Sequence, residues 1–150
     1  MKRLVLGTAA LAALASCATT PTTTQLLLGT WNCESKPAFG VIKTTTTYAP
    51  DGGGKAHLTV TGASGALNFE AVGDADATWK LLEEDTKIEQ KVSAVTVSSA
   101  KLNGNTVDPK MAQTLIGPYL AGQSAASAIK IDAKTLTITA ADGSVTNCAR

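Results

Sequence analysis

Apolar and polar residues alternate with a period of two along most of the chain after residue 26. The alternation is clear in HLTV (57–60), LNFEA (67–71), ATWKL (77–81) and TLTITA (135–140). Because successive side chains of a strand point to opposite faces, this pattern predicts strands with one buried face. We expect about nine strands, the sixth bent between its ends, over residues 30–36, 41–49, 55–62, 66–72, 76–82, 86–102, 128–132, 135–140 and 144–149.

Turn sequences separate most of these expected strands. They are PDGGG (50–54), GASG (62–65), VGD (72–74), NGN (103–105) and DG (142–143). The Asn-Gly and Asp-Gly pairs favour hairpins, because these residues accept a positive φ. The sequence therefore predicts a mainly β fold of antiparallel strands joined in an up-and-down order.

One segment, residues 108–127, departs from the strand pattern. Asp108 can cap a helix, Pro109 is tolerated in a first helical turn, and apolar residues follow at helical spacing. These apolar residues are Met111, Leu115, Ile116, Tyr119 and Leu120. Gly117-Pro118 should kink this helix or split it in two. We expect a short kinked helical insertion that packs on the sheet, and a ligand gate is the alternative.

The first sixteen residues have the pattern of a secretory signal peptide. Lys2 and Arg3 precede an apolar run over residues 4–14, and the small residues Ala15 and Ser16 follow it. The apolar run is about half the ~20 residues that a membrane-spanning helix requires. The chain is therefore expected to be exported rather than to span a bilayer.

The end of this segment, LASC (14–17), resembles the lipobox of bacterial lipoproteins. The resemblance implies that Cys17 is alkylated by diacylglycerol, that residues 1–16 are cut away, and that the new amine is acylated. Because Ala18 rather than aspartate follows the cysteine, it also implies the periplasmic face of the outer membrane. The alternative is ordinary cleavage after Ala15, which leaves Cys17 as a free thiol.

The segment ATTPTTTQ (18–25) has no charged residue, and its one small apolar residue is Ala18, so the segment has little to bury. It predicts a tether. The expected division is a signal peptide over 1–16, a lipidated cysteine with a Thr-rich tether over 17–25, and one domain over 26–150.

Cys33 and Cys148 lie in the first and last expected strands. In an oxidising compartment two such cysteines favour a disulfide, which requires Cα atoms within about 7 Å. The ends of the strand order would then be neighbours, which predicts a closed barrel of about 8–9 strands. Two unpaired thiols are the alternative. One conflict arises, because Cys33 shares a face with Trp31 whereas Cys148 lies opposite Val145, so a bulge or frayed end is expected.

The charges point to no nucleic-acid partner, since 13 basic and 12 acidic residues are scattered without a basic patch. The one histidine, His57, falls on an expected polar face without an identifiable nucleophile. Asp74-Ala75-Asp76 resembles the start of a calcium loop but lacks its glycine and final glutamate. We expect a monomer that is not an enzyme, with no catalytic residue, metal or cofactor.

Three segments together resemble the small bacterial lipocalin-like lipoproteins: LLGTWNC (27–33), TYAPDGGG (47–54) and ATWKL (77–81). The resemblance implies a lipocalin-like barrel for a small apolar or amphipathic ligand, with Trp31 plugging one end. The insertion at 108–127 departs from that family, whose helix follows the last barrel strand. The candidate ligand-binding residues are the aromatic side chains Trp31, Tyr48, Phe69, Trp79 and Tyr119.

A second segment, TGASGALNF (61–69), resembles the Ser-Gly loop of periplasmic lysozyme inhibitors, although Asn68 and Phe69 replace its tyrosine. This resemblance implies a protein partner, a hydrolase such as lysozyme. A hairpin turn at Gly62 and Gly65 explains the same residues. A ligand-binding barrel, an inhibitor or immunity lipoprotein, and a structural envelope protein therefore remain open.

Overall fold

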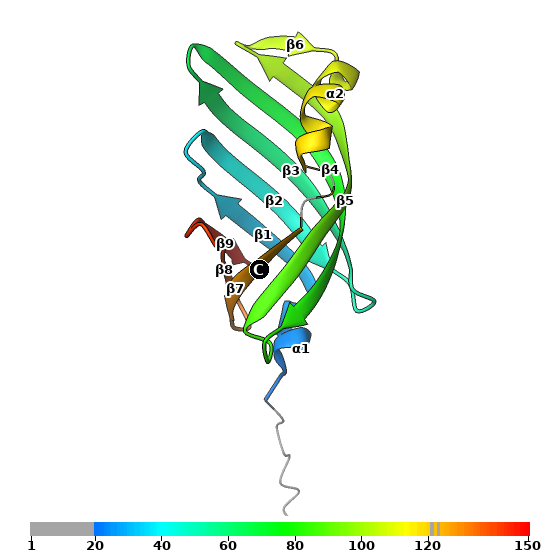
Figure 1. Ribbon diagram of the computed structural model, residues 1–150, viewed down its shortest axis with the longest axis vertical. Helices are drawn as coiled ribbons and strands as arrows, with labels where there is room; N and C mark the ends of the chain where they lie inside the picture. Colours follow the sequence, from blue (N-terminus) through cyan, green and yellow to red (C-terminus); the bar gives the residue numbers. More distant parts are fainter. Residues whose placement is uncertain (1–19, 121, 123) are drawn as a thin grey trace, which may run out of the picture.

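The computed structural model describes residues 20–120, 122 and 124–150, with the backbone alone for 115–120. In this part of the chain nine antiparallel strands form one sheet, and two helices accompany it (Figure 1). The elements are α1 (Thr23–Leu27), β1 (Gly29–Ser35), β2 (Gly40–Tyr48), β3 (Gly53–Ser64), β4 (Leu67–Leu82), β5 (Lys87–Leu102), β6 (Asn105–Val107), α2 (Pro109–Leu120), β7 (Ser124–Ile131), β8 (Thr135–Thr139) and β9 (Val145–Ala149).

The strands pair in chain order and the pairing closes into a ring of eight. From β1 to β5 each strand pairs with the next, β5 continues to β7, β8 and β9, and β9 pairs with β1. Strand β6 lies outside the ring, paired with the far end of β5. The mainly β, antiparallel prediction is confirmed, and so is the expected contact between the first and last strands.

Two strands predicted over 66–72 and 76–82 form the single strand β4. The VGD segment between them is continuous strand rather than a turn. Its pairing with β5 shifts between Val72 and Gly73 and again between Asp76 and Ala77, because β5 carries one extra residue at each point, Ser98 and Ser93. A side chain at Gly73 would place its Cβ atom 2.4 Å from the Thr96 carbonyl oxygen. Glycine at this position therefore permits close approach of β5, a role that a sequence pattern does not separate from a turn.

The other turn predictions agree better with the structure. Asn103 and Gly104 have φ values of 47° and 80° and join β5 to β6, a strand that the sequence did not predict. Gly143 has φ 84° in the turn between β8 and β9. Strand β7 begins at Ser124, four residues before its expected start.

Part of the predicted tether is helical. Thr22 caps α1: its hydroxyl accepts from the Gln25 backbone N–H, and the Gln25 side chain accepts from the Thr22 N–H. The helix ends on Leu27, which is fully buried. The last three residues of the predicted tether, Thr23–Gln25, therefore belong to a helix, where capping and burial of Leu27 offset the low helix propensity of threonine.

Helix α2 runs from Pro109 to Leu120 without interruption, so the expected division at Gly117-Pro118 is wrong. Pro118 cannot donate to the Thr114 carbonyl and its ring crowds that carbonyl, but the helix ends two residues later, so the disturbance falls in the last turn. The helix lies along the part of β5 beyond Lys91, where pairing with β7 stops. There the Gln113 side chain makes the hydrogen bonds that a neighbouring strand would make. Its amide N–H donates to the Val95 carbonyl (2.7 Å), and its amide oxygen accepts from the Val97 N–H (2.6 Å).

The core is concentrated at the α1 end of the ring. Its largest fully buried side chains are Trp31, Leu27, Ile88 and Leu136. We call this the closed end. Strands β3, β4 and β5 have 12, 16 and 16 residues, whereas β8 and β9 have five each, so the long strands extend beyond the short ones at the opposite end (Figure 1).

Cys33 and Cys148 are directly opposed in the register of β1 and β9 and form a disulfide, with Cα atoms 3.9 Å apart. No bulge or frayed end is needed between them. Val145 is 42% exposed, whereas Cys148 is buried and Thr146 is half-buried. The expected conflict therefore does not arise, because Val145 lies on the outer face of β9, whereas Thr146 and Cys148 lie on its inner face.

Candidate ligand-binding site

Trp31 forms the floor of the ring interior. Its indole N–H donates to the Leu27 carbonyl (2.8 Å), so α1 and β1 are joined across the closed end. The Arg150 guanidinium lies 4.2 Å from the centre of the Trp31 ring and donates to the Leu28 carbonyl (2.8 Å). Trp31 therefore has the packing position that the sequence predicted, and its buried surface faces protein on all sides.

Tyr48 and Trp79 lie above this floor and contact each other edge to face, with ring centres 5.8 Å apart. The Trp79 indole N–H donates to the Gly53 carbonyl (2.9 Å), and the Gln90 amide donates to the Tyr48 hydroxyl (2.8 Å). Burial raises the pKa of Tyr48 to about 12, although the Gln90 hydrogen bond acts in the opposite direction. Tyr48 is therefore a neutral hydroxyl at physiological pH.

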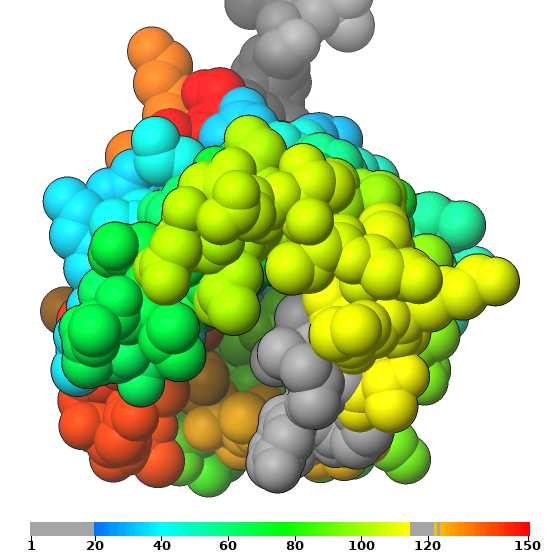
Figure 2. Space-filling view, turned by 90° about the horizontal axis from the view of Figure 1, so that it is seen from above, coloured from blue at the N-terminus to red at the C-terminus, as the bar shows by residue number. Residues whose placement is uncertain are grey.

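An apolar cavity of about 560 Å³ lies at the opposite end of the ring. The side chains that line it come mainly from the projecting strands and from α2, and they include Ile42, Val60, Phe69, Ala100, Leu102 and Met111. Ile42, Val60, Ala71 and Ala100 are consecutive partners across β2, β3, β4 and β5, so one row of residues forms a wall of the cavity. Figure 2, seen from this end, shows a hollow beside the yellow-green β5–β6 hairpin and the yellow helix α2.

The entrance to this cavity carries exposed apolar side chains. Phe39, Leu102 and Met111 line the cavity, and Leu67 pairs with Ser64, which also lines it; all four are 40–60% exposed. Phe39 and Phe69 have ring centres 6.1 Å apart, so the aromatic contact continues from the entrance into the cavity. We call these four exposed residues the apolar rim. Single exposed apolar residues are ordinary, but a group at the entrance of an apolar cavity is typical of a binding site.

A second interior cavity, of about 280 Å³, shares Ile42 with the apolar cavity and extends from Tyr48, near the closed end, to Ser144 in the β8–β9 turn. Its lining is rich in hydroxyl and amide groups, with Thr44, Thr46, Tyr48, Gln90, Ser127 and Thr146 among them. We call it the inner chamber. Ser127, which is 7% exposed, is a polar residue among the buried ones.

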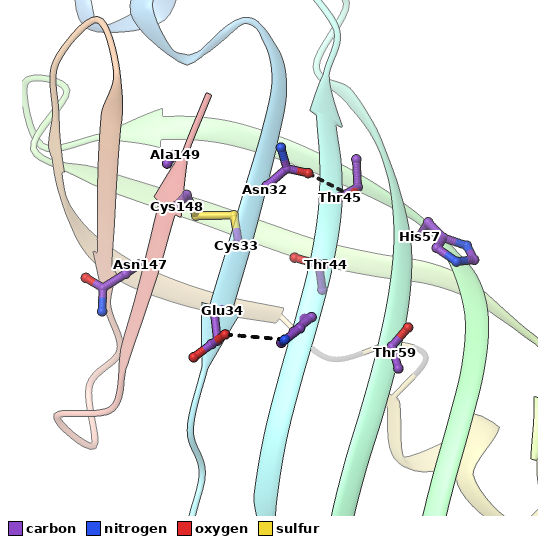
Figure 3. A pocket seen from close by; sticks show the side chains of 11 residues that line it. Asn32, Cys33, Glu34, Thr44, Thr45, His57, Thr59, Asn147, Cys148 and Ala149 are labelled. Carbon is purple, nitrogen blue, oxygen red and sulfur yellow. Dashed lines mark hydrogen bonds and ion pairs between the residues drawn. A yellow bond between two sulfur atoms is a disulfide. The ribbon is translucent and has the colours of Figure 1, made fainter. Parts of the chain in front are cut away.

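The outer face of β1, β2, β3 and β9 carries a third depression, of about 460 Å³ (Figure 3). Exposed polar residues line it, and two pairs of them interact: Thr45 donates to Asn32 (3.0 Å), and Lys43 lies 3.9 Å from Glu34. His57 also lies here, and its Nδ1 atom is 2.9 Å from Asp74 Oδ1. The two cysteines that line the depression are joined in the disulfide, so this lining offers His57 no free thiol.

The structure separates the predicted ligand-binding residues. Phe69 lines the apolar cavity, Tyr48 lines the inner chamber, and Trp31 and Trp79 pack at the closed end. The side chain of Tyr119 lies outside the described residues, as does Cys17. The sequence analysis missed Phe39, the one aromatic residue left out of the prediction, and the inward-facing aliphatic row from Ile42 to Ala100. The alternation in β2 to β5 predicts that these residues face inward, but it does not predict how far they lie from the closed end.

The Ser64-Gly65 pair forms the turn of the β3–β4 hairpin, where Ser64 pairs with Leu67 and Gly65 has φ 59°. Gly62 also has a structural role, because a Cβ atom there would lie 2.4 Å from the Phe39 carbonyl oxygen. The turn therefore accounts for Gly65, and the close approach of the Phe39 carbonyl accounts for Gly62.

No protein-family model matches the chain, and a search of curated proteins returned no significant match. Within the described ranges, neither helix is long and apolar enough to cross a membrane. The same residues hold no group of three histidine, cysteine or acidic side chains placed to bind a metal ion.

Proposed function

We propose that the protein is a lipid-anchored lipoprotein of the cell envelope, with a lipocalin-like barrel that holds a small apolar or amphipathic ligand. The apolar cavity of about 560 Å³ behind the apolar rim carries this proposal. Its volume lies within the range of roughly 300–1,000 Å³ that is usual for small-molecule sites. A ligand seated there would remove the rim and the aliphatic row from water, which is favourable for apolar surface.

The position of the cavity also fits an anchored protein. The described chain begins at Thr20, close to α1 at the closed end, whereas the apolar rim lies at the other end (Figure 1). Two residues lie between Cys17 and Thr20, so the three steps from one Cα atom to the next span at most about 11 Å. A lipid on Cys17 would therefore hold the closed end near the membrane, and the cavity would open into the periplasm.

Filling the cavity is expected to abolish this binding. We expect Val60→Trp to weaken binding of the neutral fluorescent probe N-phenyl-1-naphthylamine by tenfold or more, because Val60 is part of the cavity wall. Fluorescence titration of the purified Cys17→Ser chain measures the affinity. The matched control is Thr61→Trp, which adds the same side chain at the next, outward-facing position. Equal affinity in both variants, or a wild-type chain that fails to bind the probe, would contradict the proposed function.

The anchor has a separate test. We expect Cys17→Ser to move the protein from the membrane fraction to the soluble periplasmic fraction, because the serine hydroxyl does not take the place of the thiol in lipidation. Fractionation and immunoblotting measure the distribution, and Cys33→Ser serves as a control that leaves Cys17 intact. Retention of Cys17→Ser in membranes at the wild-type level would show that another feature holds the protein there.

A further inference from the structure

The two interior cavities have opposite polarity. The entrance cavity is apolar, whereas the inner chamber, which shares Ile42 with it, has a mixed lining in which hydroxyl and amide groups outnumber the apolar residues Cys33, Ile42, Ile138 and Ala140. A purely apolar ligand would bind better in an interior whose lining stays apolar from the entrance to the closed end. The deeper polar groups indicate that the preferred ligand has a polar part that passes the apolar rim and continues inward.

Hydrogen-bonding capacity in the inner chamber is not used up by the protein. The Tyr48 hydroxyl accepts from Gln90, and its own proton has no acceptor among the described residues. The Ser127 hydroxyl likewise makes no hydrogen bond within the described part of the chain, and its residue lines the inner chamber, where a ligand can reach it. Thr46 donates to Thr44 over 3.3 Å, a long bond that a ligand can replace. Among the described residues no buried side-chain nitrogen or oxygen atom lacks a partner, so these hydroxyls are open to the chamber and free to hydrogen-bond a polar ligand there.

The inner chamber offers no charge to that partner. Among the described residues that line it there is no lysine, arginine, aspartate or glutamate. Among the described residues that line the apolar cavity, the charged ones are Glu70 and Lys101, which lie 3.8 Å apart with their side chains about half exposed. Burial of an ionised head group without a counter-ion is strongly unfavourable. The inner chamber therefore disfavours a carboxylate or an ammonium group and favours hydroxyl or amide groups.

We propose that the interior binds a single-chain amphiphile with an uncharged, hydroxyl-bearing head group. The head group enters first and hydrogen-bonds Tyr48, Gln90 and Ser127 in the inner chamber, and the alkyl chain lies in the apolar cavity. This inference rests on the proposed function and specifies its ligand class and orientation.

Competition against N-phenyl-1-naphthylamine on the full Cys17→Ser chain tests the head-group preference. Monolauroylglycerol, laurate and dodecyltrimethylammonium carry alkyl chains of similar length, and each is used below its critical micelle concentration at pH 8. We expect the glyceride to bind at least tenfold more tightly than either ion. Equal or tighter binding of laurate would overturn the inference while leaving the proposed function intact. A chain that fails to bind the naphthylamine would instead remove both.

Isosteric substitutions test the orientation. We expect Thr44→Val with Thr46→Val, or Tyr48→Phe, to weaken glyceride binding by about fivefold or more, as for the loss of one or two hydrogen bonds. Binding of the naphthylamine should change less than twofold. The matched control is Thr45→Val, on the outer face of the same strand. Glyceride affinity that is unchanged in every inward variant would contradict head-first binding, and thermal unfolding confirms that each variant is folded.

Discussion

Replacing Cys33 and Cys148 together with alanine is expected to lower the free energy of unfolding by about 4–5 kcal/mol. The disulfide joins residues 115 positions apart, so it removes a large amount of conformational entropy from the unfolded chain. This loss is a large fraction of the roughly 5–15 kcal/mol that stabilises an ordinary domain. Urea unfolding of the double variant, compared with the parent in a Cys17→Ser background, measures the difference.

The disulfide crosses the pairing of β1 with β9, which we call the seam. The seam is short, so loss of the disulfide should have a local effect that can be measured. Strands β1 and β9 pair over four residues of each strand, whereas β4 and β5 pair along most of their length. We therefore expect amide exchange in the double variant to increase first in β9. Reduction of the parent under mild denaturant should reproduce the loss of stability. A loss below about 1 kcal/mol in both measurements would mean that the seam holds without its covalent link.

Replacing Trp31 with alanine is expected to cost about 3–5 kcal/mol, the range for loss of a large buried aromatic side chain. Trp31 is fully buried, and its removal would leave a cavity at the closed end. It would also remove the donor for the Leu27 carbonyl and the aromatic face beneath Arg150. Urea unfolding at constant pH measures this cost, and the fluorescence of Trp79 reports the transition in the variant.

Two comparisons show whether burial is the cause. Trp31→Phe keeps an aromatic ring but loses the indole N–H, so it should cost less than Trp31→Ala. Val145→Ala removes an apolar side chain that is 42% exposed, and it should change stability by less than about 1 kcal/mol. Similar costs at Trp31 and Val145 would contradict the assignment of Trp31 to the core.

The predictions from local pattern agree with the structure where the pattern reflects local geometry. Alternation over 57–60 and 135–140 indicated strands because the two faces of a strand differ in exposure over a few residues. Asn103-Gly104 indicated a turn because its backbone requirement is local as well. The VGD segment was misassigned because a glycine that opens space for a neighbouring strand has the same local appearance as a glycine in a turn.

The lining of the apolar cavity was harder to predict because aromatic residues were given too much importance. Trp31 and Trp79 use their rings and N–H groups to pack the closed end, whereas small and aliphatic residues such as Val60 and Ala100 form the cavity. Both sets face inward with the same period. What separates the two sets is their distance from the closed end along the axis of the ring. That distance depends on how far β3, β4 and β5 extend beyond their neighbours.

The sequence by itself determined the strand-rich class, the chain-order pairing, the neighbouring ends and the partner of Cys33, because alternation, turn residues and cysteine placement have direct geometric consequences. Only the tertiary structure decided where the interior is filled and where it is hollow. It also decided that Val145 faces outward and that Gln113 covers the free edge of β5. These features follow from register and unequal strand lengths, which are set by contacts between residues far apart in the chain.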